Sequence, residues 1–82
     1  MDLKEKVLRA VSEHQVSTLM VLGLAKTGKE MTFISKEGEK VLKGEEAVKE
    51  HFKGIYRCTN GYNVSEEEIE KAYQIFREIF LK

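Results

Sequence analysis

The sequence has no proline, no tryptophan and a single cysteine among its 82 residues. One cysteine cannot close a disulfide within the chain, so Cys58 excludes the class of small secreted domains held together by disulfides. The positions of Cys58, His14 and His51 also lack the spacing of a zinc site. We therefore expect no metal and no cofactor. A chain of this length buries only about 60–65% of the surface that it exposes when unfolded, so its core stands alone or is completed by another chain.

Long hydrophobic runs are absent as well. The longest is Leu19–Ala25, which contains Gly23 and is far shorter than the roughly 18–20 residues that cross a membrane. The first ten residues alternate charged and apolar side chains and do not resemble a signal peptide. Together with the free thiol of Cys58, these observations predict a cytoplasmic protein.

An excess of charge of either sign is the third absence. Fourteen Lys and Arg residues balance fourteen Asp and Glu residues, which gives a formal net charge of zero. A dedicated nucleic-acid-binding domain usually has a basic excess or a basic patch. The overall charge therefore does not indicate a class of partner.

The two ends of the chain carry clear helix patterns within what we expect to be one domain, residues 1–82. Leu3, Val7 and Val11 fall on one face of a helix from Asp2 to about His14, with Asp2 as its cap. Ser65 and Glu68 form a capping box at the start of the last helix. The apolar stripe of that helix consists of Ile69, Ala72, Tyr73, Phe76, Ile79 and Phe80.

The middle of the chain predicts three strands. Residues 17–25 are apolar on both faces of an alternating pattern, which is typical of a central strand. A turn at 26–29 leads to a return strand at 30–35, and a turn at 36–39 leads to a short strand at 40–43. A helix from Gly44 to about Lys53 follows, with Gly54 in the usual terminating position. The predicted fold is therefore α+β, in the order α-β-β-β-α-α, a three-stranded antiparallel meander packed by helices.

A loop from Tyr56 to Val64 is predicted next, and the segment from Lys53 to Tyr62 holds the candidate binding residues Lys53, Tyr56, Arg57 and Tyr62. Tyrosine and arginine dominate the energetic hot spots of protein interfaces, and they also stack on bases and contact phosphates. The alternative is that both tyrosines pack over the sheet.

The last helix offers a candidate surface for self-association. Ile75, Ile79 and Leu81 widen its apolar arc beyond one face, which favours a homodimer contact. The leading hypothesis is a small non-enzymatic protein-interaction module that associates with itself, of the kind made by prokaryotes, their viruses or mobile elements.

Two other functions are open at this point. The order α-β-β-β-α is similar to that of double-stranded-RNA-binding domains, although Glu45 and Glu46 stand where those domains place lysines. The lysines available for such a surface are Lys26, Lys29, Lys36, Lys40 and Lys43. A small enzyme using His51 and Cys58 requires the two side chains within hydrogen-bond reach and a third group to orient the imidazole, and the sequence shows no such group.

Overall fold

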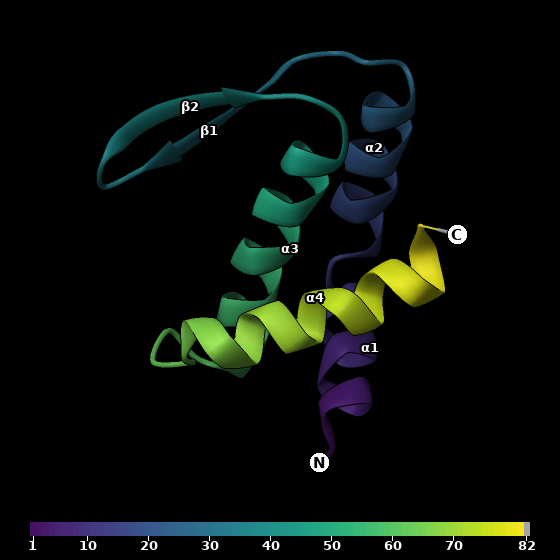
Figure 1. Cartoon of the computed structure of the whole chain (residues 1–82), viewed down its shortest axis with the longest axis vertical. Coiled ribbons are helices and arrows are strands. Elements are labelled where there is room, and N and C mark those ends of the chain that lie inside the picture. Colours follow the sequence, from purple (N-terminus) through teal and green to yellow (C-terminus); the bar gives the residue numbers. More distant parts are fainter. Residues whose placement is uncertain (82) are drawn as a thin grey trace.

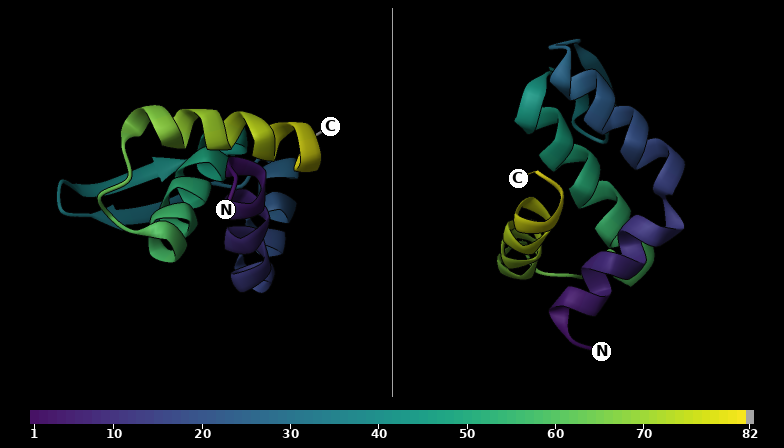
Figure 2. Two further views of the ribbon diagram at one scale, coloured as in Figure 1. Left: turned by 90° about the horizontal axis from the view of Figure 1, so that it is seen from below. Right: turned by 90° about the vertical axis from the view of Figure 1, so that its right-hand side faces the viewer.

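Four helices and one β-hairpin make up the computed structural model, which describes residues 1–81 (Figure 1). In chain order, the elements are α1 (Leu3–Glu13), α2 (Gln15–Lys26), β1 (Met31–Ser35), β2 (Gly38–Leu42), α3 (Gly44–Asn60) and α4 (Glu66–Phe80). Helices α1 and α2 follow one another with a bend between them, and α3 lies alongside both (Figure 2). Helix α4 crosses α1 and α3.

The predicted strand at 17–25 is wrong, because these residues form most of α2. The sheet consequently has two strands and not three. Thr18, Val21, Leu22 and Ala25 recur at helical spacing and face α3, whereas the remaining apolar residues of α2 lie on its opposite side. A helix that is apolar on both sides gives the same pattern as a buried strand. The similarity of element order to double-stranded-RNA-binding domains disappears with the third strand.

The predicted end of the next helix at Gly54 is also wrong, since α3 continues to Asn60. Ile55 and Tyr56 are buried on the same face as Phe52. Their burial outweighs the cost of a glycine inside a helix, about 0.5–1 kcal/mol. The helix ends instead at Gly61, whose φ of 110° favours glycine. The segment predicted as a loop from Tyr56 to Val64 is therefore helical over its first five residues.

The predicted starts of the first and last helices are confirmed. The backbone N–H of Glu5 donates to Asp2 Oδ1 over 2.8 Å at the start of α1. The backbone N–H of Glu68 donates to Ser65 Oγ over 3.1 Å at the start of α4. Both caps satisfy helix N–H groups that have no partner within the helix.

The β-hairpin projects from the helices (Figure 1). Its strands pair antiparallel, with Met31 opposite Leu42 and Ser35 opposite Gly38. The strand predicted at 30–35 is confirmed, and the next strand begins earlier than predicted, within the expected turn. Met31 is the one buried residue of the two strands.

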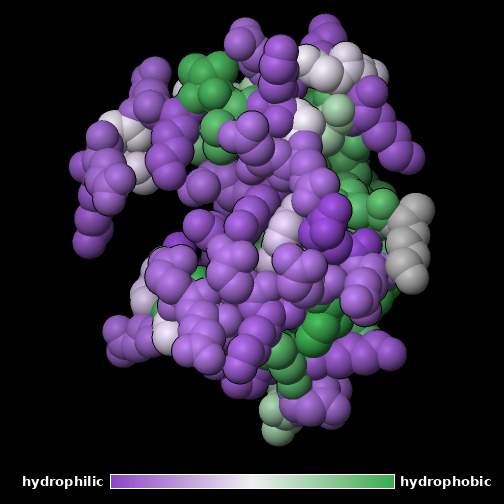
Figure 3. All heavy atoms as spheres, viewed as in Figure 1, coloured by the Kyte–Doolittle hydropathy of each residue, from purple (hydrophilic) through white to green (hydrophobic). Residues whose placement is uncertain are grey.

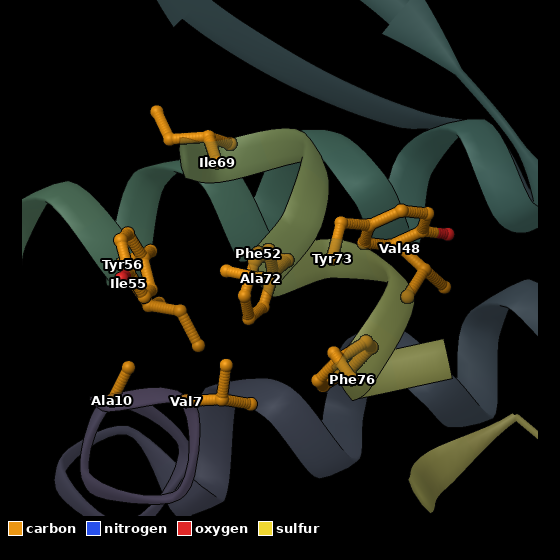
Figure 4. Packing of buried hydrophobic residues seen from close by; sticks show 10 residues of the cluster. All are labelled: Val7, Ala10, Val48, Phe52, Ile55, Tyr56, Ile69, Ala72, Tyr73 and Phe76. Atoms are coloured by element: carbon orange, nitrogen blue, oxygen red, sulfur yellow. The ribbon is translucent and has the colours of Figure 1, made fainter. Parts of the chain in front are cut away.

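The core lies where α1, α3 and α4 meet, and Phe52 of α3 is at its centre (Figure 4). The ring centroid of Phe52 lies 4.9 Å from that of Phe76, 5.6 Å from that of Tyr56 and 5.8 Å from that of Tyr73. Val7 and Ala10 point toward this cluster from α1. Three helices thus share one aromatic core.

Candidate functional site

The four candidate binding residues do not form one surface. Tyr56 is fully buried, and its hydroxyl donates to Glu68 Oε2 over 2.6 Å. Its ring has no exposed area to offer a partner, so the packing role is the one that the geometry supports. Tyr62, in the connection between α3 and α4, is 77% exposed.

Lys53 and Arg57 both reach Glu66 at the start of α4. The Lys53 ammonium lies 4.0 Å from Glu66 Oε2, and the Arg57 guanidinium donates to Glu66 Oε1. These ion pairs link α3 to α4 at a partly exposed position, where such pairs contribute about 0–1 kcal/mol each. Lys53 and Arg57 therefore share one carboxylate within the domain.

Two tyrosine–carboxylate hydrogen bonds join α4 to α3, one at each end of the core. Tyr56 donates to Glu68, and Tyr73 donates to Glu45 Oε2 over 3.0 Å. Burial and the neighbouring carboxylate raise the pKa of both tyrosines. The tyrosine hydrogen bond lowers the pKa of each glutamate. Glu45 also accepts from Arg77 Nε over 2.7 Å. These carboxylates act as acceptors that hold two helices together.

The two histidines lie near one another, His14 at the bend between α1 and α2 and His51 on α3. His51 Nε2 lies 3.0 Å from the Thr18 hydroxyl, and His14 Nδ1 lies 3.0 Å from the Ala10 carbonyl oxygen. Burial lowers the pKa of His51, and the nearby His14 lowers it further. Cys58 is exposed on the same helix as His51, seven residues and about 10 Å further along the axis. The structure therefore does not bring His51 and Cys58 together as a nucleophile and its base.

A shallow apolar groove lies between the end of α2, the start of α3 and the end of α4. Its volume is about 320 Å³, and its walls include Leu22, Val48, Phe80 and Leu81. The carboxylate at its edge, Glu45, is already bound by Tyr73 and Arg77. Ligand pockets combine apolar walls with a few polar groups that converge on the ligand. Separately, within residues 1–81 no group of three or more His, Cys, Asp or Glu residues is placed to hold a metal ion.

The outward side of α2 is the most unusual surface of the molecule. We define the α2 outer face as Val16, Leu19, Met20, Gly23 and Leu24. Its four large side chains are 74%, 69%, 61% and 37% exposed in chain order. In the right-hand view of Figure 2, α2 lies at the edge of the described part of the chain, with α3 along its inner side.

Charge is missing from this face. Residues 15–25 contain no Asp, Glu, Lys or Arg, although charged residues make up 34% of the chain. An eleven-residue uncharged stretch in so charged a protein was the sequence signal for this surface. The alternating pattern predicts burial on both sides of a strand, whereas α2 buries only its inner side, and of its residues Thr18 alone is buried.

The rest of the surface is more ordinary. Figure 3 shows mostly hydrophilic atoms on this face of the molecule, with hydrophobic atoms near the top, along the right-hand edge over α2 and near the bottom. On α4, Ile79 is 41% exposed, whereas Ile75 and Leu81 pack against the core. Ile34 and Val41 are exposed on the hairpin. In the part of the chain that the structure describes, no other element exposes four large apolar side chains.

Comparison with known proteins adds no functional assignment: no family model, no curated protein and no solved structure matches this chain. Among the helices described for residues 1–81, none combines the length and the apolar character needed to cross a bilayer.

Proposed function

We propose that this chain is a small protein-interaction module without chemistry of its own, and that it binds its partner through the α2 outer face. The single observation that carries this proposal is the exposure of four large apolar side chains on one uncharged helix face. Contiguous apolar patches on soluble proteins usually mark interaction surfaces. The pattern matches helix-face recognition, in which anchors recur every three or four residues.

The size of the patch constrains the partner. Burying a fully exposed Val, Leu or Met side chain stabilises a complex by about 1.5–3 kcal/mol. At the exposures observed, the four side chains contribute roughly 4–7 kcal/mol from this side of an interface. Association costs about 4–15 kcal/mol in lost freedom of motion. The partner must therefore bring a comparable apolar surface of its own.

Nucleic acid is a poorer partner than protein, because the lysines available to bind it lie on a nearly neutral hairpin. Lys29, Lys36, Lys40 and Lys43 lie on or beside the hairpin, but residues 29–43 also contain three glutamates. Lys40 is further engaged with Glu50 over 3.8 Å. Phosphate binding requires uncompensated positive charge, and this arm is nearly neutral. The exposed thiol of Cys58 suits a reducing compartment, so we place the interaction in the cytoplasm.

The test is a pull-down in which the tagged chain captures partners from a lysate of the source cells, with and without nuclease. The captured components are then identified by mass spectrometry. The wild type is compared with Met20→Glu, which places a charge on the α2 outer face. Ile79→Glu is the matched control, since it adds the same charge to a half-exposed apolar position on α4. We expect a stoichiometric protein that survives nuclease, is retained by Ile79→Glu and is lost with Met20→Glu.

Two results contradict the proposal. Captured material that disappears on nuclease treatment identifies the chain as a nucleic-acid binder. Equal capture by wild type and Met20→Glu shows that the α2 outer face is not the interaction surface. Circular dichroism of both variants, at positions where surface changes shift stability by only about 0.5 kcal/mol, verifies that each is folded.

A further inference from the structure

We propose that the partner seated on the α2 outer face is a second copy of this chain, with the two α2 helices packed antiparallel about a two-fold axis beside Met20. This inference rests on the proposed function and names its partner. It differs in location from the predicted homodimer contact through Ile75, Ile79 and Leu81, of which Ile75 and Leu81 are partly buried against the core.

The absence of charge on the face favours a like surface. In a two-fold interface the same patch lies on both sides, so any charge near the axis would face its own copy. Residues 15–25 contain no such charge. A partner recognised through charged groups would require complementary charges on this face, and residues 15–25 supply none.

The order of side chains along α2 is also self-complementary. The helix has twelve residues and is about 18 Å long, with Met20 near its middle. Antiparallel pairing about that point places Val16 of one copy against Leu24 of the other, and Met20 against Met20. Gly23 lies in the middle of the face and has no atom within 4 Å of where a Cβ would stand, so the two backbones can approach closely there.

The charges that flank α2 match under the same symmetry. Glu13 precedes the helix and Lys26 ends it. Antiparallel packing brings Lys26 of each copy to the end where the other copy carries Glu13, a carboxylate that also pairs with Arg9 of its own chain over 3.1 Å. The antiparallel helix dipoles add to this attraction, since each positive end lies beside a negative end.

The apolar area also fits a second copy better than a partner of ordinary surface. One chain contributes four partly exposed side chains, and a second copy contributes the same four by symmetry. With so few side chains, we expect the interface to fall below the roughly 1,200–2,000 Å² of a stable complex, which predicts a weak dimer that dissociates on dilution.

The experiment is sedimentation velocity on the purified full chain from about 5 to 500 µM, the range in which a small interface assembles. We expect the wild type to shift from monomer to dimer across this range. Met20→Glu and Met20→Lys each place like charges across the two-fold axis, so each alone is expected to dissociate at least about tenfold more readily. Mixed in equal amounts, the two variants are expected to recover the dimer, because opposite charges then meet at the axis.

Two further variants keep the proposal testable whatever the charged variants do. Gly23→Ala adds a methyl group where the helices approach and is expected to weaken the dimer while leaving the chain folded. Ile79→Glu is expected to dimerise like the wild type. A wild type that stays monomeric throughout, charged variants that dimerise unchanged, a mixture that does not recover, or dissociation by Ile79→Glu each overturns the proposal.

Failure of self-association is distinguishable from failure of the proposed function. A monomeric wild type that still captures another protein in a Met20-dependent way removes only the second copy as partner. Capture that is indifferent to Met20 removes the α2 outer face altogether.

Discussion

At the scale of single residues, two tyrosines join α3 to α4 through both their rings and their hydroxyl groups. Tyr56 and Tyr73 bury their rings in the core and direct their hydroxyls to glutamates on the neighbouring helix. A buried hydroxyl requires a partner, and the glutamates supply it from partly exposed positions. The ring contributes to burial, and the hydroxyl determines how α3 and α4 are aligned.

Replacing Tyr56 by Phe tests this division of roles. The variant keeps the ring and loses the hydrogen bond to Glu68, so we expect it to be less stable by about 1–2 kcal/mol in urea unfolding. Tyr62→Phe is the matched control, since Tyr62 is 77% exposed and its change should stay within about 0.5 kcal/mol. An equal effect of the two substitutions would show that the Tyr56 hydroxyl does not hold α4 in place.

The same hydrogen bond predicts a dependence on acid. The hydrogen bond from Tyr56 lowers the pKa of Glu68 below its usual 4.5. A carboxylate whose pKa is lowered by folding stabilises the folded chain at pH values above its unfolded pKa. This contribution is lost as the pH falls through its folded pKa. The wild type should therefore lose stability below pH 4.5 more steeply than Tyr56→Phe, as measured by urea unfolding across this range.

His51 gives a second pH effect, at milder acidity. Burial lowers its pKa below the usual 6.5, so the unfolded chain takes up a proton before the folded chain does. The free energy of unfolding should consequently fall as pH decreases below 6.5. In His51→Gln, which can still reach the Thr18 hydroxyl, this part of the decline should be absent. The same slope in both proteins would locate the titration elsewhere.

At the scale of elements, the glycines show where burial lets a helix continue and where the backbone conformation ends it. Gly23 and Gly54 lie inside α2 and α3, and the apolar residues around them keep the helices intact. Gly61 ends α3 with a φ of 110° and a ψ of 146°, a region that is essentially confined to glycine.

Alanine at two of these positions should have opposite effects. Gly23→Ala meets no atom within 4 Å and should raise the free energy of unfolding by about 0.5–1 kcal/mol. Gly61→Ala should lower it by about 1–3 kcal/mol, because its backbone conformation is strained for alanine. Urea unfolding at low protein concentration measures both without a contribution from self-association. Destabilisation by Gly23→Ala under these conditions would contradict the exposed position of α2.

At the scale of the whole molecule, stability depends on one aromatic cluster. Phe52 contacts rings from α3 and α4 and lies beside the α1 residues of the core. A domain of this length has a total stability of about 4–12 kcal/mol. The loss of one central ring is therefore a large part of the whole.

Phe52→Ala should remove about 3–5 kcal/mol and lower the midpoint of thermal unfolding substantially. Thermal unfolding followed by circular dichroism measures this loss. Ile34→Ala, at an 82% exposed position on the hairpin, should leave the midpoint nearly unchanged. A small effect of Phe52→Ala would mean that the helices are held independently of this cluster.

The elements that were predicted correctly are those with local signals. Asp2 and Ser65 mark helix starts through their own side chains, and the hairpin follows from short alternating segments around a glycine turn. The errors share one cause. Residues 17–25 and the region after Gly54 have patterns that fit two structures, and packing against α3 and α1 decides between them.

The candidate site was predicted less well than the fold, for the same reason. Residue type suggested Tyr56 and Arg57, because tyrosine and arginine are common at interfaces. Only the tertiary structure shows that Tyr56 is buried and that Arg57 is paired with Glu66. Exposure is a property of the packed molecule, and no single-residue preference specifies it.

The sequence by itself determined that this chain is one small domain with balanced charge, that its first and last helices begin at Asp2 and Ser65, and that it has an uncharged stretch over residues 15–25. Local hydrogen bonds and composition are sufficient for these properties. The tertiary structure decided that this stretch is a helix and that its inner side is Thr18, Val21, Leu22 and Ala25. It also decided that Val16, Leu19, Met20 and Leu24 remain exposed. Which side of an apolar segment is buried depends on the element that packs against it, and here α3 covers one side only.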